Sequence, residues 1–360
     1  MRRPELGHHR RMAENEPSGP PRPGLVVPVR RDPKGLLGPT KGRAAGPGWR
    51  RTSHGFYVPS HVSNDKVEQR IVEASVVVPE GLGITGWAGL RWLGGRWFDG
   101  TTSAGDRRPV TIAIGTHDIK PQPAYGIAVT GEGLWRRMVI DVDRLSITRP
   151  EWSVSFEMRY ADDWRQAVVV LSMAAYNDLV SVEEQAEFLS HQNGWTGVPQ
   201  ARKALPFADE NCWSPVEVLM KLVWQIDAEL PRPLCNHPVF DLRGRHLGTP
   251  DVIDPETGLM GEYDGPGHLV PGQKARDIRR ADLLRAHDLE SVVMVAEDFQ
   301  DLDAYLHRLR VAHRRAARHP IEQRTWTLEP PSWWTPTVTV AQRRALTAEQ
   351  RERFLKYRSA

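Results

Sequence analysis

Cysteine is scarce in this chain of 360 residues, which contains only Cys212 and Cys235. The two cysteines have neither the CxxC spacing nor the paired histidines of a zinc site, and two cysteines cannot build a disulfide framework. We therefore expect neither zinc nor structural disulfides, as in a protein of the reducing cytoplasm.

Long hydrophobic runs are also absent. No apolar run reaches the ~18 residues that a membrane span requires. The arginines near the N-terminus are not followed by the apolar stretch of a secretory signal. We expect a cytoplasmic protein that makes no membrane contact. The length, the apolar fraction of 40% and the 13 tryptophans allow two packed domains.

Acidic residues are few at the N-terminal end. Residues 1–53 hold 12 Lys or Arg and only 4 Asp or Glu, in a chain whose net charge is +3. The same stretch is rich in Pro and Gly and has almost no hydrophobic periodicity, which predicts a disordered basic arm over residues 1–54. Such an arm either contacts the nucleic-acid backbone or is only a solubilising tail, and the sequence leaves both readings open.

The rest of the chain divides into three parts. Residues 55–210 mix helical and strand patterns, which predicts an α+β domain. Residues 211–320 follow the order helix, strand (234–241), hairpin, helix, strand, helix, which predicts an α/β fold with a mixed sheet. Residues 321–360 combine a Pro/Trp segment with a basic tail, which either binds a partner or wraps around the body.

The most informative stretch is residues 248–268, GTPDVIDPETGLMGEYDGPGH. Its central PETG lies between two short runs of β-formers and predicts a β-hairpin with a four-residue loop. This register places Asp251 opposite Glu262, so that their side chains share one face. Asp264 is two residues beyond Glu262 and lies on the same face.

Three carboxylates on one face repel one another unless a cation is bound. Oxygen ligands of this kind suit Mg²⁺ or Mn²⁺, which usually keep coordination positions for water and substrate phosphates. The alternative is an acidic, solvated hairpin without a metal, and the spacing alone does not exclude it.

The residues from 214 to 299 resemble the PD-(D/E)XK nuclease superfamily, and within it the actinobacterial relatives of very-short-patch-repair (Vsr) endonucleases. Those relatives share an Asp, then E-x-D-G-x-x-H, then a helix rich in Asp and Arg, and then an apolar strand. In this chain the run is Asp251, Glu262, Asp264 and His268, followed by RDIRRADLL and SVVMVA. The resemblance implies a restriction-endonuclease-like mixed sheet flanked by helices.

The same resemblance implies roles for the residues of the run. Asp251 would bridge the metal ion, Glu262 would be the second ligand, and His268 would be the general base, a task that suits a side chain with a pKa near neutrality. Asp264 would be a further metal ligand, and it stands where the superfamily usually has a lysine. The apolar strand also lacks an arginine that those relatives often carry, as its centre is Val292-Val293-Met294.

Two helices complete the expected site. Glu217 matches the helix glutamate that supports metal or water in the superfamily, but with Ser214 it also forms a capping box that needs no metal. The helix after the hairpin carries four basic side chains that would bind DNA phosphates, or that form a solvated face paired with neighbouring acids: Lys274, Arg276, Arg279 and Arg280.

Three segments of residues 55–210, GFYVP, QRIVEA and TGWAGLRWLGG, resemble the N-terminal part of proteins similar to type IV abortive-infection antitoxins. That resemblance implies DNA and a cognate toxin as partners. We therefore expect a Mg²⁺-dependent DNA endonuclease of DNA repair or phage defence. The alternatives are a catalytically degenerate, DNA-binding transcriptional regulator like an antitoxin, and an interaction protein that acts through its arm and tail.

Overall fold

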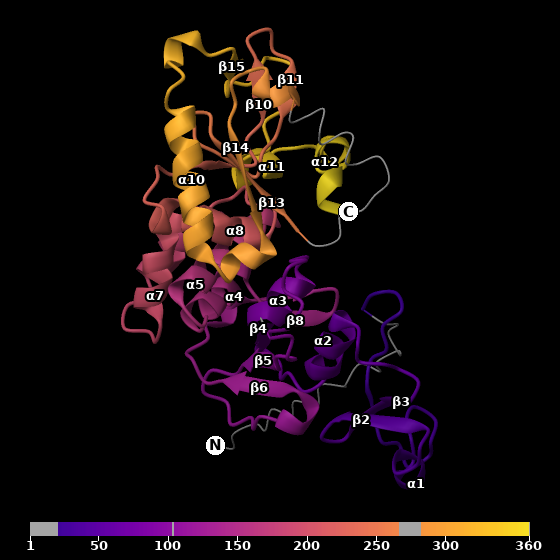
Figure 1. Cartoon of the computed structure of the whole chain (residues 1–360). Coiled ribbons are helices and arrows are strands. Elements are labelled where there is room, and N and C mark those ends of the chain that lie inside the picture. Colours follow the sequence, from indigo (N-terminus) through magenta and orange to yellow (C-terminus); the bar gives the residue numbers. More distant parts are fainter. Residues whose placement is uncertain (1–20, 103, 266–281, 360) are drawn as a thin grey trace, which may run out of the picture. The chain divides into compact units, whose positions relative to one another are not determined.

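The computed structural model describes residues 21–102, 104–265 and 282–359 (Figure 1). The chain forms two compact units, Met1–Val78 with Asp141–Leu145, and Pro79–Ile140 with Ser146–Ala360. Within the described ranges, no helix combines the length and the hydropathy that crossing a bilayer requires.

The first unit contains a three-stranded antiparallel sheet in the order β1-β3-β2. Its elements are β1 (Val29–Arg30), α1 (Lys41–Ala44), β2 (Trp49–Ser53), β3 (Phe56–Pro59) and α2 (Val67–Ser75). Arg50 on β2 donates to the Glu73 carboxylate on α2 at 3.0 Å, which ties the helix to the sheet. The disordered arm predicted over residues 1–54 is therefore wrong for β1, α1 and β2. The β2–β3 turn accounts for this order, since Gly55 has a φ of +85° that lets WRRTS fold back on FYVP.

A five-stranded sheet in the order β6-β5-β4-β8-β7 follows along the chain. Its strands and the helix after the first of them are β4 (Gly83–Thr85), α3 (Gly86–Trp92), β5 (Val110–Ala113), β6 (Ile127–Thr130), β7 (Val139–Val142) and β8 (Leu145–Thr148). Four helices follow: α4 (Pro150–Arg159), α5 (Trp164–Tyr176), α6 (Val182–Ser190) and α7 (Val198–Ala204). The capping box predicted by Ser181-x-x-Glu184 is present at the start of α6.

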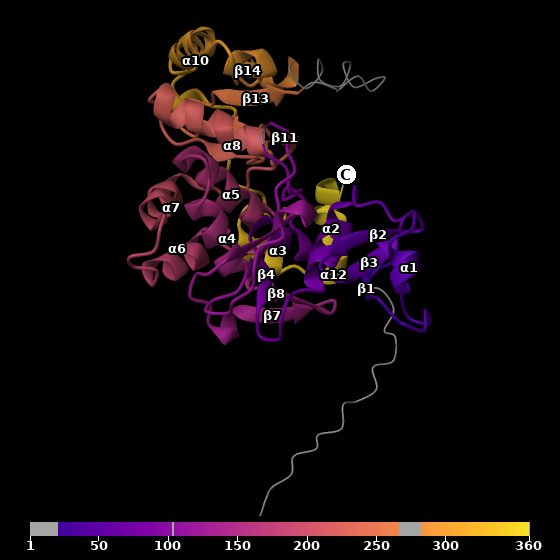
Figure 2. The ribbon, with the colours of Figure 1, turned by 90° about the horizontal axis from the view of Figure 1, so that it is seen from below.

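A mixed four-stranded sheet follows, in the order β14-β13-β12-β9. Its strands are β9 (Leu234–Cys235), β12 (Val252–Ile253), β13 (Met260–Asp264) and β14 (Ser291–Val295). β12 runs antiparallel to β9 and β13, whereas β13 and β14 are parallel. α8 (Pro215–Leu222) packs beside β13 and α10 (Leu302–Ala316) packs beside β14 (Figure 2). The predicted α/β content with a mixed sheet is confirmed.

A second, small antiparallel sheet in the order β11-β10-β15 lies next to the mixed one. Its strands are β10 (Val239–Asp241), β11 (His246–Gly248) and β15 (Trp326–Thr327). The single strand predicted over residues 234–241 is thus two strands in two sheets. Asn236 has a φ of +43°, which bends the chain between them.

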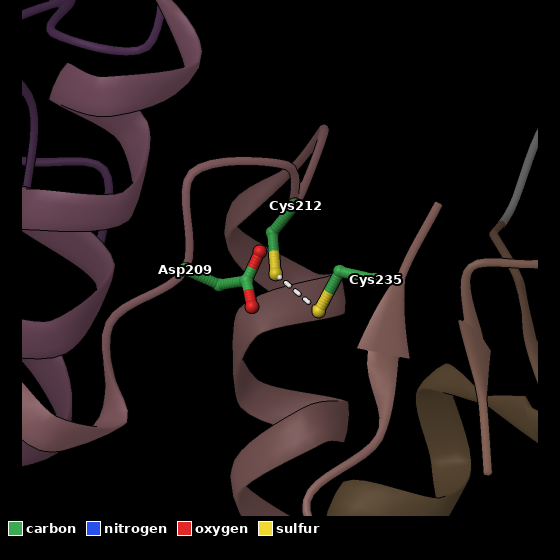
Figure 3. Close-up of side chains that lie close together, drawn as sticks. All are labelled: Asp209, Cys212 and Cys235. Carbon is green, nitrogen blue, oxygen red and sulfur yellow. Dashed lines mark hydrogen bonds between the residues drawn. The ribbon is translucent and has the colours of Figure 1, made fainter. Parts of the chain in front are cut away.

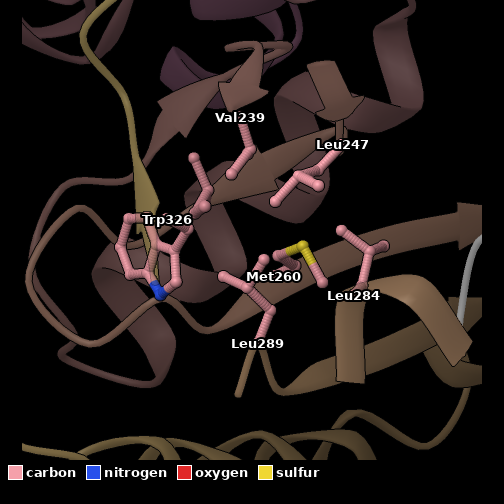
Figure 4. Packing of buried hydrophobic residues seen from close by; sticks show 7 residues of the cluster. Val239, Leu247, Met260, Leu284, Leu289 and Trp326 are labelled. Carbon is pink, nitrogen blue, oxygen red and sulfur yellow. The ribbon is translucent and has the colours of Figure 1, made fainter. Parts of the chain in front are cut away.

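A buried apolar cluster joins the two sheets (Figure 4). Ile253 and Met260 contribute to it from the predicted hairpin, and they pair directly with each other. Val239, Leu247, Leu284, Leu289 and Trp326 complete it. On the hairpin face of Asp251 and Glu262, the pair nearer the loop, Ile253 and Met260, is therefore buried in this cluster.

The remaining elements are short. A π-helical turn, η4 (Val223–Asp227), extends α8. Near the C-terminus lie α11 (Val340–Arg344) and α12 (Ala348–Phe354). Single 3₁₀ turns are η1 (Pro123–Tyr125), η2 (Arg136–Met138), η3 (Leu205–Phe207), η5 (Ala296–Phe299), η6 (Ile321–Gln323) and η7 (Lys356–Ser359).

Candidate functional site

The hairpin of β12 and β13 has the predicted register. Val252 pairs with Gly261 and Ile253 pairs with Met260, and continuing outward by one pair places Asp251 opposite Glu262. The loop closes through the buried Asp254, whose carboxylate accepts bonds from the Glu256 N–H at 2.9 Å and the Thr257 hydroxyl at 2.7 Å. The predicted turn is therefore confirmed, and Asp254 is the acid that holds it in shape.

Asp251 is held from two sides. Its Oδ2 accepts a hydrogen bond from the Tyr263 N–H on β13 at 2.7 Å. Its backbone carbonyl accepts one from the Asn236 N–H, just beyond β9, at 2.9 Å. The side chain is half-buried. The Tyr263 N–H thus orients the carboxylate and the Asn236 N–H fixes the backbone that carries it, which is the arrangement expected of a preorganised ligand.

Glu217 caps its own helix, which is one of the two roles that the sequence left open. The carboxylate accepts bonds from the Trp213 N–H at 2.7 Å and the Ser214 hydroxyl at 3.0 Å at the start of α8. The residue is only 9% exposed. Burial first, and then the charge of Asp251, raise the pKa of Glu217 from 4.5 to about 7. Glu217 therefore caps its helix, and burial and the charge of Asp251 both oppose its ionisation.

Two asparagines complete the surroundings of Glu217. Asn236 Nδ2 donates to Glu217 Oε2 at 2.7 Å and to the Asn211 carbonyl at 2.9 Å. In return, Asn211 Nδ2 donates to the carbonyls of Cys235 and Asn236 at 2.8 and 2.9 Å. Sequence reasoning missed both asparagines, because neither belongs to a motif and they meet only through the fold.

The other predicted site residues differ in placement. Glu262 is half-buried on β13, and Asp264 is exposed at the end of the strand. Among the described residues, Asp251, Glu262 and Asp264 do not form a set of three with ligand atoms within 4.8 Å of one another. The predicted convergence of all three carboxylates is therefore not found.

Five predicted site residues lie outside the described residues. They are the expected general base and the four expected phosphate-binding side chains: His268, Lys274, Arg276, Arg279 and Arg280. Their roles stay predictions.

The set of three ligands that the described residues do bring within 4.8 Å is Asp209, Cys212 and Cys235 (Figure 3). The two sulfurs are 3.0 Å apart, and both thiols are buried. Burial raises the pKa of both thiols above its ordinary value. Spacing along the chain predicts no metal here, but the fold brings Cys235 beside Cys212 although the two lie 23 positions apart in the sequence.

Comparisons with known proteins give relatives without a stated activity. No protein-family model matches the chain, and no solved structure matches it. The chain is 28% identical over 194 residues to "Uncharacterized protein Rv2248" of Mycobacterium tuberculosis strain ATCC 25618 / H37Rv and to "Uncharacterized protein MT2308" of strain CDC 1551 / Oshkosh. Each alignment covers 52% of this chain and 69% of the relative. Any functional conclusion therefore rests on the site itself.

Proposed function

We propose that the chain is a metal-dependent DNA endonuclease that hydrolyses phosphodiester bonds, and that its mixed sheet is restriction-endonuclease-like. The observation that carries this proposal is the pair of acids Glu217 and Asp251. Asn236 links the two acids, since its side chain donates to the Glu217 carboxylate and its N–H donates to the Asp251 carbonyl. Burial and then the charge of Asp251 raise the pKa of Glu217. Ionising a buried carboxyl near a second carboxylate lowers the free energy of unfolding. Acids placed in this way are typical of functional sites, including those that bind a cation.

A divalent cation fits the acids present. It would relieve the repulsion between Asp251 and Glu217, and oxygen ligands are the ones that Mg²⁺ and Mn²⁺ prefer. Asp251 and Glu262 would hold the ion from opposite strands of the hairpin, and Asp264 lies further out on the same strand as Glu262. When bound, Mg²⁺ or Mn²⁺ acts as a Lewis acid that draws electron density from a phosphate.

The chain's own residues would do the rest. Asp251 is oriented by the Tyr263 N–H, and Glu217 is oriented by Asn236. His268 would accept a proton from the attacking water. The basic side chains at 274, 276, 279 and 280 would neutralise DNA phosphates and position the strand. The antitoxin-like part, residues 55–210, would add a contact to DNA or to a cognate toxin, in DNA repair or phage defence.

A cleavage assay tests this function. Wild type would be incubated with duplex, mismatched and branched DNA in Mg²⁺ or Mn²⁺, and compared with Asp251→Ala and His268→Ala. The matched control is Glu256→Ala, which removes an exposed carboxylate from the tip of the same hairpin. We expect nicking or cleavage by wild type and Glu256→Ala, loss of at least about a hundredfold in the two site variants, and full inhibition by EDTA.

Two results would count against the nuclease. If no substrate is cut with either metal, the site is not catalytic. If DNA is bound in a gel-shift experiment without any cleavage, the protein is better described as an antitoxin-like regulator. Cleavage that persists in Asp251→Ala would mean that another site or a contaminating nuclease cuts the DNA.

A further inference from the structure

We propose that Asp209, Cys212 and Cys235 form a second, structural metal site, selective for a thiophilic divalent cation such as Zn²⁺. The ligand atoms of these three side chains lie within 4.8 Å of one another, and Figure 3 shows the carboxylate and both sulfurs turned toward a common point. The site shares no ligand with the Asp251 site, so its metal binding can be tested whether or not the proposed nuclease function holds.

The ligand types and their local spacing suit zinc. Asp209 and Cys212 are separated by two residues in the loop before α8, the same short spacing that places two zinc ligands on one loop in known sites. Cys235 reaches the same point from β9. A loop and a strand that supply ligands from opposite sides are a common way to close a metal site around an ion. In this chain the two cysteine ligands come from segments that are distant in the sequence, Cys212 from the loop before α8 and Cys235 from β9.

The distance between the two sulfurs requires a small adjustment. They are 3.0 Å apart, whereas two sulfurs bound tetrahedrally at about 2.3 Å from zinc are about 3.8 Å apart. A rotation of one side chain that separates the sulfurs by less than an ångström is enough. Cys212 lies in the loop before α8, ahead of the N-cap residue Ser214, so the rotation would involve its own side chain and no residue of the helix.

A buried positive charge beside the thiols supports an anionic ligand set. Lys221 is completely buried on α8, and its ammonium donates to the Phe207 carbonyl at 2.6 Å. No carboxylate within the described ranges lies at ion-pair distance from it, although its charge acts on both cysteines. A buried charge without a counter-charge is costly. Zinc with two thiolates and one carboxylate carries one net negative charge, which would balance Lys221.

A cavity of about 800 Å³ lies against the site and is lined by Asp209 and Cys235. A water molecule in this cavity would take the fourth position, which gives the four-coordinate geometry that zinc prefers.

The metal would brace the parts that hold Glu217. Asn211 lies between the ligands Asp209 and Cys212, and Asn236 follows Cys235 directly. These two asparagines bind each other, and Asn236 binds Glu217. A cation that ties the loop before α8 to β9 would therefore keep this hydrogen-bond network in place.

Cobalt substitution tests the proposal. The full chain would be purified anaerobically under reducing conditions, stripped with chelator and titrated with Co²⁺, whose bonds to thiolates give a charge-transfer absorption in the near ultraviolet. We expect one thiolate-bound Co²⁺ per chain, counted from the charge-transfer band and displaced by one Zn²⁺. The band should vanish in Cys212→Ser and Cys235→Ser, and Asp209→Asn should bind at least roughly tenfold more weakly. Asp162→Asn, an exposed acid on a nearby loop, is the control that should bind normally.

A second measurement covers the case in which a cysteine variant does not fold. In wild type, bound Zn²⁺ should slow alkylation of both thiols at least roughly tenfold, read by mass spectrometry with and without the metal. The proposal is overturned if reduced wild type shows no charge-transfer band, if Zn²⁺ leaves alkylation unchanged, or if the anaerobic protein contains a Cys212–Cys235 disulfide.

Discussion

Glu217 couples the folding equilibrium to pH, because its folded pKa is about 7 against an ordinary value of 4.5. Below pH 4.5 the carboxyl is protonated in both states, and its contribution to stability is fully present. As the pH rises toward 7 and above, the folded state must accept a buried anion beside Asp251, and that contribution is lost. We expect wild type to lose up to about 3 kcal/mol between about pH 5 and pH 8 relative to Glu217→Gln.

Urea unfolding at a series of pH values measures this difference. Glutamine imitates the protonated carboxyl and keeps the acceptor for Trp213, so the variant should be the more stable protein at pH 8. Glu187→Gln, which changes an exposed acid on α6, should follow wild type at every pH. Parallel curves for wild type and Glu217→Gln would show that Asp251 and burial do not act on Glu217 as argued.

Substitutions at Asn236 distinguish the free-energy cost of lost hydrogen bonds from the cost of a positive φ. Asn236→Ala removes the donor to Glu217 and to the Asn211 carbonyl, and it places a Cβ without a polar group at a φ of +43°. We expect a loss of about 2–4 kcal/mol, from unsatisfied buried acceptors and from the strained backbone.

Asn236→Gly is the matched variant, because glycine accepts the same backbone conformation without strain. It should lose only the hydrogen-bond part, so Asn236→Ala should be less stable than Asn236→Gly by about 1 kcal/mol. Equal stabilities in chemical denaturation would mean that the positive φ costs nothing here.

Single residues of the site differ in how far the sequence can predict them. Asp251 and Glu262 follow from counting outward from a four-residue loop, which is local information. The neighbours of Glu217 do not, since Asn211 and Asn236 lie 25 positions apart and meet only when β9 packs beside the loop before α8. The same is true of Cys212 and Cys235. Contacts of this kind depend on tertiary packing, which no spacing rule contains.

The hairpin of β12 and β13 is an element whose shape depends on one glycine. Gly258 has a φ of +74°, and a Cβ there would lie 2.5 Å from the Trp326 ring and 3.1 Å from Leu289. We expect Gly258→Ala to cost about 3 kcal/mol or more, from the left-handed backbone and from overpacking of the apolar cluster. The register of Asp251 and Glu262 should suffer with it.

Gly126→Ala is a control for the backbone part alone. Its φ is +67°, and nothing lies within 4 Å of the added Cβ, so it should cost only about 1 kcal/mol. Thermal unfolding of the two variants gives the comparison. If both lose the same stability, Trp326 and Leu289 move aside without cost and the hairpin is not held by this contact.

Elements were predicted best where periodicity and a turn signal agree, as in the hairpin and α6. The strands of residues 29–53 were missed because the high content of Pro, Gly and Arg hid the short alternation of WRRTS. The strand expected over 234–241 was too long because a left-handed asparagine cannot be recognised from composition. In both cases sheet pairing outweighs local propensity.

At the scale of the whole molecule, the C-terminal segment belongs to the body of the second unit. The sequence left open whether residues 321–360 bind a partner or wrap the body. Arg343 on α11 is completely buried, and its Nε donates to the Asp178 carboxylate at 2.6 Å. The same guanidinium donates to the carbonyls of Ala175 and Glu210 at 2.8 and 3.0 Å. One side chain therefore joins the C-terminus to the end of α5 and to the loop before α8.

The loss of Arg343 should loosen this whole region. Arg343→Ala leaves buried carbonyls and part of the Asp178 charge without a donor, and we expect it to cost about 3–5 kcal/mol. Arg344→Ala is the neighbouring comparison. Arg344 pairs with the exposed Glu184 and donates to the Asp178 carbonyl at 3.2 and 3.0 Å in exposed positions, so its loss should cost only about 1 kcal/mol. Thermal unfolding gives the stabilities, and limited proteolysis with mass spectrometry shows whether residues after 329 are released first. If Arg343→Ala keeps the C-terminal segment protected from protease, the segment is held by its apolar contacts, and the buried guanidinium contributes little to joining it to the body.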